Sequence, residues 1–290
     1  MPAPPLLHLA AVSIVGRKRD HNEDSFGLGP VGGTLATTSG VAASLVWAPP
    51  GVLLMVCDGI GGSNAGEVAS SLAVATLAEH VGRAEFTPEA FRSAICTTAA
   101  VIRAKATEAP GLQGMGTTLT CLWLQGGRAL WGQAGDSRGY RWRRPRGSPA
   151  AAGPPLLHFT PEHTPVARLV RGGLLTPLQA RQHRKRHLID QALGNAPEGF
   201  APEVGPLELQ EGDLVLLCSD GLTDGLDDGA LATLLEHHGD EPAAQLAQIL
   251  VAAANAASGR DNITGLVLRV GEPAAPAWRP FGWLTRWIRR

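Results

Sequence analysis

The chain has 290 residues, of which 44% are hydrophobic and 18% are charged, and its mean hydropathy is +0.02. A composition this apolar excludes a disordered chain, and no uninterrupted apolar run reaches the length of a membrane span. The formal net charge is −1, which excludes nucleic-acid binding through a strongly basic body. The length allows two domains of about 150 residues or one larger mixed domain.

The first half of the chain predicts a loop, a buried strand and two helices. Residues 29–50 are rich in Gly, Thr, Ser and Pro and predict a loop inserted between two ordered pieces. Residues 52–57 form an unbroken apolar run, which is typical of a strand buried on both faces. Residues 65–80 and 88–105 have apolar positions at helical spacing, and Thr87 is a suitable N-cap for the second helix.

The second half predicts mostly strands. A second loop is expected at residues 143–155 and an alanine-rich helix at 242–257. Apolar runs bounded by turn residues predict strands at 117–124, 128–134, 140–142, 214–218 and 263–270. Strands come in groups and helices in pairs, without strict alternation. A doubly wound parallel sheet is therefore disfavoured, and the order favours an α+β sandwich.

The cysteines and the N-terminus indicate a reducing compartment. Cys57, Cys96, Cys121 and Cys218 form no CxxC pair and lie in apolar runs, so they are interpreted as small buried hydrophobes. The first residues lack the basic region of a secretion signal. A cytoplasmic location is expected.

Acidic residues stand at the ends of the predicted strands. Glu23 and Asp24 follow the first strand-like run, and the other acids each lie beside a turn residue: Asp58, Asp136, Asp220 and Asp261. A carboxylate at the tip of a core strand is costly unless it is paired, hydrogen-bonded or bound to a cation. A single Asp-Gly pair is explained by a turn alone, but a set of six acids predicts a cation site. Oxygen donors without neighbouring His or Cys select Mg²⁺ or Mn²⁺ over zinc.

Three other functional motifs are excluded because residues that they require are absent. Residues 61–67 imitate the glycine spacing of a P-loop, but Glu67 stands where that loop needs a lysine. Residues 220–228 lack the alternating ligands of an EF-hand. Ser219 lacks the flanking glycines of a nucleophile elbow.

A series of short motifs carries a resemblance to a known family. In chain order they are GRKRDHNEDSF (16–26), VCDGIGGSNAGEVAS (56–70), GMGTT (114–118), AGDSRGY (134–140), TPEH (160–163), ALG (192–194), CSDGLTD (218–224) and GRDNIT (259–264). The chain resembles the metal-dependent Ser/Thr protein phosphatases (the PPM, or type 2C, family) in their compact bacterial form. The resemblance implies a four-layer αββα sandwich with a two-metal site at one end of the central sheets.

The resemblance also implies a ligand set for Mn²⁺ or Mg²⁺. Asp58 would bridge two ions, and Glu23 and the Gly59 carbonyl would complete the second ion's protein ligands. The first ion would be held by Asp220 and Asp261. Asp136 would serve a third, weaker ion.

Two further residues receive catalytic roles from the resemblance. Asp24 would orient metal-bound water, and Arg19 would grip the substrate phosphate with its planar, permanently charged fork. A solvated arginine in the basic run 17–19 is the alternative for Arg19. Ile60 departs from the histidine that animal members place there, so the leaving group would take its proton from metal-bound water. His163 is interpreted as structural.

The implied activity is hydrolysis of phosphoserine and phosphothreonine on proteins, opposing a bacterial Ser/Thr kinase, by a monomeric enzyme. A partner-switching phosphatase that acts on one small regulator is an open alternative. A non-catalytic relative that binds phosphoproteins is disfavoured because every implied ligand is present.

The resemblance covers residues 1–270 as one domain, with a flap at about 160–193. Six basic residues of the flap would favour acidic phosphopeptides, or they form a solvated helical face: Arg168, Arg171, Arg181, Arg184, Lys185 and Arg186. Residues 271–290 form a Trp- and Arg-rich tail. An amphipathic contact with a membrane surface or a docking peptide is one interpretation, and aromatics that fold back on the domain are the other.

Overall fold

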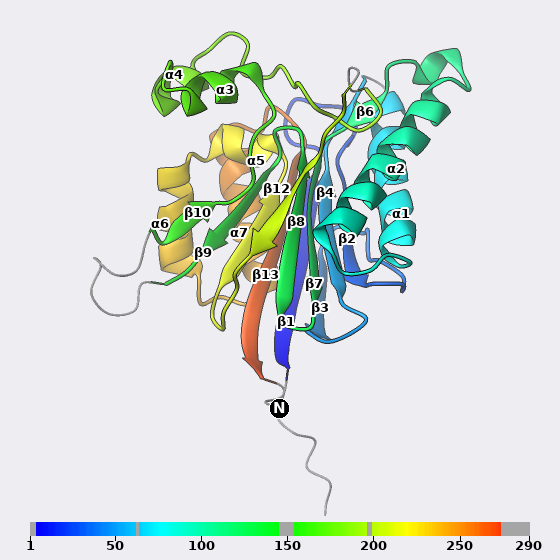
Figure 1. Cartoon of the computed structure of the whole chain (residues 1–290). Coiled ribbons are helices and arrows are strands. Elements are labelled where there is room, and N and C mark those ends of the chain that lie inside the picture. The colour runs from blue at the N-terminus through cyan, green and yellow to red at the C-terminus, as the bar shows by residue number, and fades with distance from the viewer. Residues whose placement is uncertain (1–3, 62–63, 145–153, 196–198, 274–290) are drawn as a thin grey trace, which may run out of the picture.

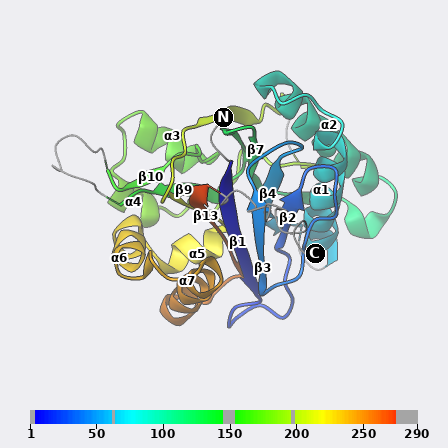
Figure 2. The same cartoon turned by 90° about the horizontal axis from the view of Figure 1, so that it is seen from below.

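The computed structural model describes residues 4–61, 64–144, 154–195 and 199–273 and shows two antiparallel sheets packed face to face, with helices covering both outer faces (Figure 1). Seen from below, the two sheets lie between one group of helices on each side (Figure 2). This arrangement confirms the α+β sandwich that the order of elements favours and the four layers that the resemblance implies.

The first sheet has six strands in the order β10-β9-β12-β13-β1-β3. Their bounds are β1 Pro5–Ile14, β3 Val41–Val46, β9 Arg138–Trp142, β10 Leu156–His158, β12 Leu214–Cys218 and β13 Ile263–Pro273. The helices on its outer face are α5 Asp220–Gly225, α6 Asp228–His238 and α7 Ala243–Ala257.

The second sheet has five strands in the order β11-β8-β7-β4-β2. Their bounds are β2 Ser25–Pro30, β4 Val52–Cys57, β7 Leu119–Gln125, β8 Arg128–Ala134 and β11 Glu203–Leu207. The helices α1 Asn64–Val81 and α2 Pro88–Ala106 cover it. The Thr87 hydroxyl caps α2 by accepting a hydrogen bond from the Ala90 amide, as the sequence predicts.

Three smaller elements complete the described chain. The strands β5 Gly59–Ile60 and β6 Gly116–Thr117 pair with each other. A 3₁₀ turn spans Pro110–Leu112. The flap helices α3 Pro165–Arg171 and α4 Pro177–Arg181 lie at the upper end of the sandwich in Figure 1.

Three apolar cores hold the four layers together. Alternate residues of β4 point to opposite faces, so Met55 packs toward α1 and α2 while Leu54 packs between the sheets. The third core lies between the six-stranded sheet and the helices α5 to α7. Because both faces of β4 and β12 are buried, these two strands carry apolar side chains at every position, which is the signal that the sequence shows.

The loop predicted at residues 29–50 is wrong over part of its length. Residues 29 and 30 end β2, Ala36 forms a bridge with Leu28, and residues 41–46 form the edge strand β3. The side chains of β3 alternate between half-buried and exposed. An edge strand that packs on one face needs few large residues, so its Ala and Ser residues hide the strand in the sequence.

The remaining differences are smaller. The strand predicted at 117–124 is divided at Thr118 into β6 and β7. The loop predicted at 143–155 lies mainly in residues 145–153, outside the described residues, and so does most of the tail predicted at 271–290. Three of the four free cysteines are buried, and Cys96 is half-buried. In the described ranges, no helix combines the length and apolarity needed to cross a bilayer.

Candidate metal centre

The pairing of the strands brings the predicted acids to one end of the sandwich. In the five-stranded sheet Ser25 lies opposite Cys57, which places Asp24 and Asp58 next to each other. In the six-stranded sheet Cys218 lies opposite Gly265, so Asp220 follows β12 where Asp261 precedes β13. In an antiparallel pair, one strand ends at the end of the sheet where its neighbour begins, so acids that are distant in sequence gather at that one end.

Asp58 is fixed through its backbone. Its carbonyl oxygen accepts hydrogen bonds from the Thr118 amide at 2.8 Å and the Thr117 hydroxyl at 2.9 Å, and its own amide donates to the Thr118 hydroxyl at 2.9 Å. The Thr118 hydroxyl in turn contacts Ser137 Oγ at 2.8 Å. These contacts position Asp58 through its backbone and do not use its carboxylate.

Asp24 joins the two sheets. It is 8% exposed, and its Oδ2 accepts hydrogen bonds from Ser219 Oγ and Thr264 Oγ1, each at 2.7 Å. Ser219 Oγ also accepts from the Thr264 amide at 3.0 Å. The carboxylate of the five-stranded sheet is therefore held by the ends of β12 and β13.

Glu23 and Gly59 lie in close contact. The Glu23 amide donates to Asn262 Oδ1 at 2.8 Å, and its carbonyl accepts from Ser70 Oγ at 2.6 Å. A Cβ atom at Gly59 would lie 2.7 Å from the Glu23 carbonyl oxygen, and one at Gly66 would lie 2.9 Å from Glu23 Oε1. A side chain at Gly59 would clash first with the Gly66 carbonyl oxygen at 2.4 Å, and one at Gly66 would displace the Glu23 carboxylate, so both positions favour glycine.

Arg19 lies at the exposed side of the acids. Its Nε and Nη2 each lie 2.8 Å from the two carboxylate oxygens of Asp261, a two-pronged ion pair. The pairing raises the pKa of Arg19, with smaller contributions from Glu23 and Asp58. The guanidinium therefore sits among the predicted ligands, where a phosphate could also reach it.

The turn that carries Asp136 is fixed by His163. Gly135 has a φ of +105°, and its amide donates to His163 Nδ1 at 3.3 Å. The other ring nitrogen of this buried histidine lies 3.1 Å from Glu203 Oε1, and burial lowers the pKa of His163. These contacts agree with the interpretation of His163 as a structural residue.

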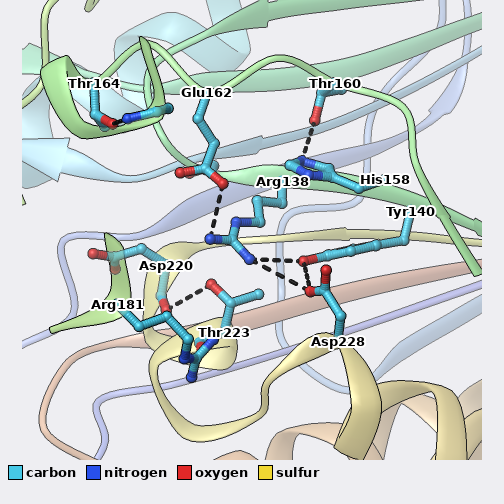
Figure 3. A network of polar contacts seen from close by, with 12 residues as sticks. Arg138, Tyr140, His158, Thr160, Glu162, Thr164, Arg181, Asp220, Thr223 and Asp228 are labelled. Atoms are coloured by element: carbon cyan, nitrogen blue, oxygen red, sulfur yellow. Dashed lines mark hydrogen bonds and ion pairs between the residues drawn. The ribbon is translucent and has the colours of Figure 1, made fainter. Parts of the chain in front are cut away.

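A half-buried arginine ties the start of the flap to the end of the sandwich where the acids gather (Figure 3). Arg138 contacts Glu162 at 2.8 Å, Asp228 at 3.6 Å and the Tyr140 hydroxyl at 2.9 Å. The Tyr140 hydroxyl donates to Asp228 at 2.9 Å. This network joins β9, α6 and the segment before α3, directly beside the Asp136 turn.

The acids raise one another's pKa values. Burial is the largest cause for Asp58, followed by repulsion from Asp24, Asp220, Asp136 and Asp261, and its pKa lies well above the ordinary value. Burial and repulsion from Asp220 and Asp261 raise the pKa of Asp24 to about 7. Burial and repulsion from Asp261 and Asp224 raise the pKa of Asp220 to about 6. Burial and repulsion from Asp220 and Glu162 raise the pKa of Asp136. Such mutual effects require the carboxylates to share one neighbourhood.

The donor chemistry fits a hard divalent cation. Glu23 Oε1 and Asp24 Oδ1 are buried oxygens that have no hydrogen-bond partner. Within the described ranges, however, no three His, Cys, Asp or Glu side chains are already arranged to hold an ion. One reason is visible at Asp261, since both of its carboxylate oxygens are engaged by Arg19. The residues fit the ions by type and location, and their side chains must adjust to bind them.

Sequence reasoning missed the small polar residues that support the acids. They are Thr117, Thr118, Ser219, Asn262 and Thr264. Each lies within a few residues of an acid or in a matched motif, but a hydroxyl or amide next to an aspartate gives no pattern of its own. Their roles depend on contacts between distant segments.

Several basic residues of the flap are engaged within the fold. Arg168 pairs with Asp190, Arg171 donates to the Glu162 carbonyl at 3.2 Å, and Arg181 donates to the Thr223 carbonyl at 3.2 Å. Arg184 and Lys185 are exposed. Only part of the predicted basic set is therefore available to a substrate.

Two family models match the sequence. The one described as Protein phosphatase 2C matches residues 42–153, and the one described as Stage II sporulation protein E (SpoIIE) matches residues 156–271.

Named relatives cover most of the chain. The serine/threonine protein phosphatase PstP of Mycobacterium tuberculosis is 37% identical over 222 residues, which are 75% of this chain and 40% of PstP. The chain thus spans well under half the length of that relative. Protein phosphatase PhpP of Streptococcus pneumoniae is 30% identical over 228 residues, which are 77% of this chain and 87% of PhpP. The solved catalytic domain of PstP in complex with 2 manganese ions has a TM-score of 0.72 and 32% identity, covering 92% of this chain and 100% of that one.

Proposed function

This chain belongs to the protein phosphatase 2C (PPM) family, and from that premise we propose that it is a Mn²⁺- or Mg²⁺-dependent phosphatase acting on phosphoserine and phosphothreonine in proteins. The observation that carries the proposal is the gathering of buried carboxylates at one end of the sandwich, with Arg19 at their exposed side. The relatives named as Ser/Thr protein phosphatases support the substrate class.

The ligand roles follow the positions of the side chains. Asp58 is close enough to Asp24, Asp220 and Asp136 to be repelled by all three carboxylates, which suits a ligand shared by two ions. Glu23 and the Gly59 carbonyl would hold one of these ions, and Asp220 and Asp261 the other. Asp136 would serve a third, weaker ion. A pair of bound divalent cations supplies a more acidic attacking water and neutralises charge on the phosphoryl oxygens.

The remaining residues position the reactants. Asp24 Oδ2 is held by two hydroxyl donors, so its Oδ1 can accept a hydrogen bond from the attacking water and fix its direction. Arg19 would release Asp261 and bind two oxygens of the substrate phosphate. Ile60 has no proton to donate, so the serine or threonine leaving group takes its proton from water.

The cellular role is part of the same proposal. The enzyme would act on substrates of a bacterial Ser/Thr kinase, as a cytoplasmic monomer, with residues 1–270 as the catalytic unit and 160–193 as the flap. The open alternatives are a phosphatase of one small regulator protein and a relative that binds phosphoproteins without hydrolysing them. Turnover of several unrelated phosphopeptides would reject both alternatives.

The decisive test is hydrolysis of a phosphothreonine peptide by the full chain with Mn²⁺, with and without chelator. We expect chelator to abolish turnover and Asp58→Asn to lower kcat/KM by at least ~10²-fold, since one side chain would serve both ions. Asp240→Asn is the matched control, because Asp240 is 80% exposed at its side chain, where it pairs with Arg144 far from the acids. Chelator-resistant turnover, or equal activity in the Asp58 variant, would refute the proposal.

A further inference from the structure

A cleft of about 600 Å³ opens beside the metal end and is not used by the proposed reaction. Its walls are α1 and the segment 33–39, and its inner end is formed by residues that precede or begin β2. Helix α1 and strand β2 lie side by side in both views (Figures 1 and 2). The volume is that of a small-molecule site.

The outer wall of the cleft is anchored at several points. Ala36 and Leu28 exchange two backbone hydrogen bonds at 2.8 and 3.1 Å, and the Gly40 amide donates to the Ala11 carbonyl at 2.9 Å. Ser39 Oγ accepts from the Ser13 amide at 2.8 Å and donates to the Ser13 carbonyl at 2.9 Å. The segment is thus bonded to β2 on one side and to β1 on the other, so the cleft is a built feature of the fold.

The lining is divided into an apolar part and a polar end. Leu35, Val74 and Ala78 supply the apolar part, and Gly27 beneath them leaves no room for a Cβ, which would lie 2.9 Å from both Leu35 and Val74. At the inner end lie the hydroxyl or amide groups of Ser13 and Asn22. A ligand that fits both parts is amphiphilic.

The charge of the lining indicates which kind of polar head group an amphiphile would need. Asp24 is the one charged side chain among the described residues that line the cleft, and no Lys, Arg or His accompanies it. An anionic head group would be repelled by this carboxylate and by the acids behind it. A neutral or cationic head that donates hydrogen bonds suits the hydroxyl, amide and carboxylate oxygens.

The polar end of the cleft is connected to the metal end through Asn22. Its Nδ2 donates to Ser13 Oγ at 2.8 Å, and its Oδ1 accepts from the Asp24 amide at 3.2 Å. Ser13 Oγ contacts Thr264 Oγ1 at 2.7 Å, which in turn donates to Asp24 Oδ2. A molecule that displaces Asn22 or Ser13 would therefore move the segment that carries Glu23 and Asp24.

We propose that this cleft is a regulatory site for a small amphiphilic amine or alcohol, whose apolar body packs against α1 and Leu35 and whose head donates hydrogen bonds near Asn22. Its binding is linked to divalent-cation binding at the neighbouring acids, and this linkage rests on the proposed function. Linkage is reciprocal, so the amphiphile changes the affinity for the ion by the factor by which the ion changes the affinity for the amphiphile.

The test uses three probes that share a 4-phenylbutyl body: 4-phenylbutylamine, 4-phenylbutan-1-ol and 5-phenylpentanoate. Each is titrated into the full chain without divalent ions, so that no bound cation offsets the charge of the acids, and binding is followed by amide chemical shifts. We expect the amine and the alcohol to bind with Kd in the millimolar range, as suits probes of this size, and the carboxylate to bind at least ~3-fold more weakly. Equal binding of all three probes would overturn the assignment.

The second part of the test uses a variant whose side chain fills the cleft. Ala75 lines the cleft on the exposed side of α1, so Ala75→Trp should fill it without disturbing the core and weaken the amine at least ~5-fold. Ala100→Trp is the matched control, because Ala100 is an exposed alanine of α2 outside the cleft. Unchanged binding in the Ala75 variant would overturn the site.

The linkage is measured without any turnover. Saturating 4-phenylbutan-1-ol should change the Kd for Mg²⁺ at least ~2-fold in the wild type and in Ala100→Trp, but not in Ala75→Trp. An unchanged Mg²⁺ affinity in the wild type would overturn the linkage. A chain that hydrolyses no phosphopeptide would refute the proposed function, while the chemical-shift titrations would still decide whether the cleft binds the amphiphile.

Discussion

The carboxylate end of the sandwich and the flap that borders it are built in opposite ways. Glu23, Asp24 and Asp58 at the strand ends are each held by hydroxyl, amide or backbone groups from distant segments, as Asp24 is by Ser219 and Thr264. The flap helices are short, and three of its leucines are largely exposed: Leu174 at 72%, Leu178 at 68% and Leu188 at 51%. In the proposed function, the chemistry that needs fixed geometry lies on the firmly held strand ends, and the flap would contact the substrate.

The strongest test of this contrast is the pH dependence of stability without metal. The folded-state pKa values of Asp24 and Asp220, about 7 and about 6, lie above their ordinary values, so between about pH 4 and pH 7 the folded state holds protons that the unfolded state has lost. Stability in chelator should therefore fall as pH rises through this range. We expect Tm at about pH 8 to lie at least ~4 °C below that at about pH 5.

Thermal unfolding followed by circular dichroism measures this effect. Excess Mg²⁺ should remove most of the difference, because a bound cation replaces the proton as the source of positive charge. Asp220→Asn should show a smaller fall in chelator. A chelated protein whose Tm does not change between the two pH values would contradict the raised pKa values.

The two regions can be compared by the loss of stability when an arginine ion pair is removed from each. Arg138 is 19% exposed and binds Glu162 and Asp228, so Arg138→Met should lower the free energy of unfolding by roughly 2–3 kcal/mol, because it leaves Glu162 partly buried without its partner. Arg168 of the flap is 57% exposed and pairs with Asp190, so Arg168→Met should cost no more than about 0.5 kcal/mol. Urea unfolding measures both values, and equal costs would remove the distinction.

The hydroxyl donors to Asp24 offer a gentler perturbation. Ser219→Ala removes one donor to Asp24 and the acceptor of the Thr264 amide, so we expect a loss of roughly 1–2 kcal/mol in stability. Because Asp24 would be held less firmly, kcat should fall about 10-fold, with KM affected less. Thr233→Ala removes an exposed hydroxyl on α6 and serves as the control. A Ser219 variant with wild-type kcat would argue against the positioning of Asp24 by this contact.

The smallest effect is expected at the surface charges of the flap. Arg184 and Lys185 are exposed, so replacing both with Gln should raise KM for an acidic phosphopeptide about 3-fold at low salt and leave kcat unchanged. The difference should vanish at high salt and be absent for a neutral phosphopeptide. Salt-independent changes would instead favour a structural role for this face.

Local patterns predicted several interior strands of the fold, but not helix α6 or the strands β10 and β11. The strands at 52–57 and 214–218 have the predicted bounds, because burial on both faces leaves an unbroken apolar run. The strand at 128–134 also has the predicted bounds, although it includes the exposed Arg128 and the buried polar Gln133. The edge strand β3 and the short flap helices were not predicted, since a half-exposed strand or a helix of one or two turns leaves little periodicity to detect.

The candidate site shows the same division. The sequence placed six acids at strand ends and, through the resemblance, gave each of them a role, but it contained no sign that Arg19 would pair with Asp261 or that Asn22 would join Asp24 to a cleft. The reason is physical. The type of a residue and its neighbours in sequence determine how unfavourable it is to bury that residue without a partner, so the sequence alone indicates that the acids need partners. Which distant residue becomes the partner depends on strand order and register, and these are decided only when the two sheets pack together.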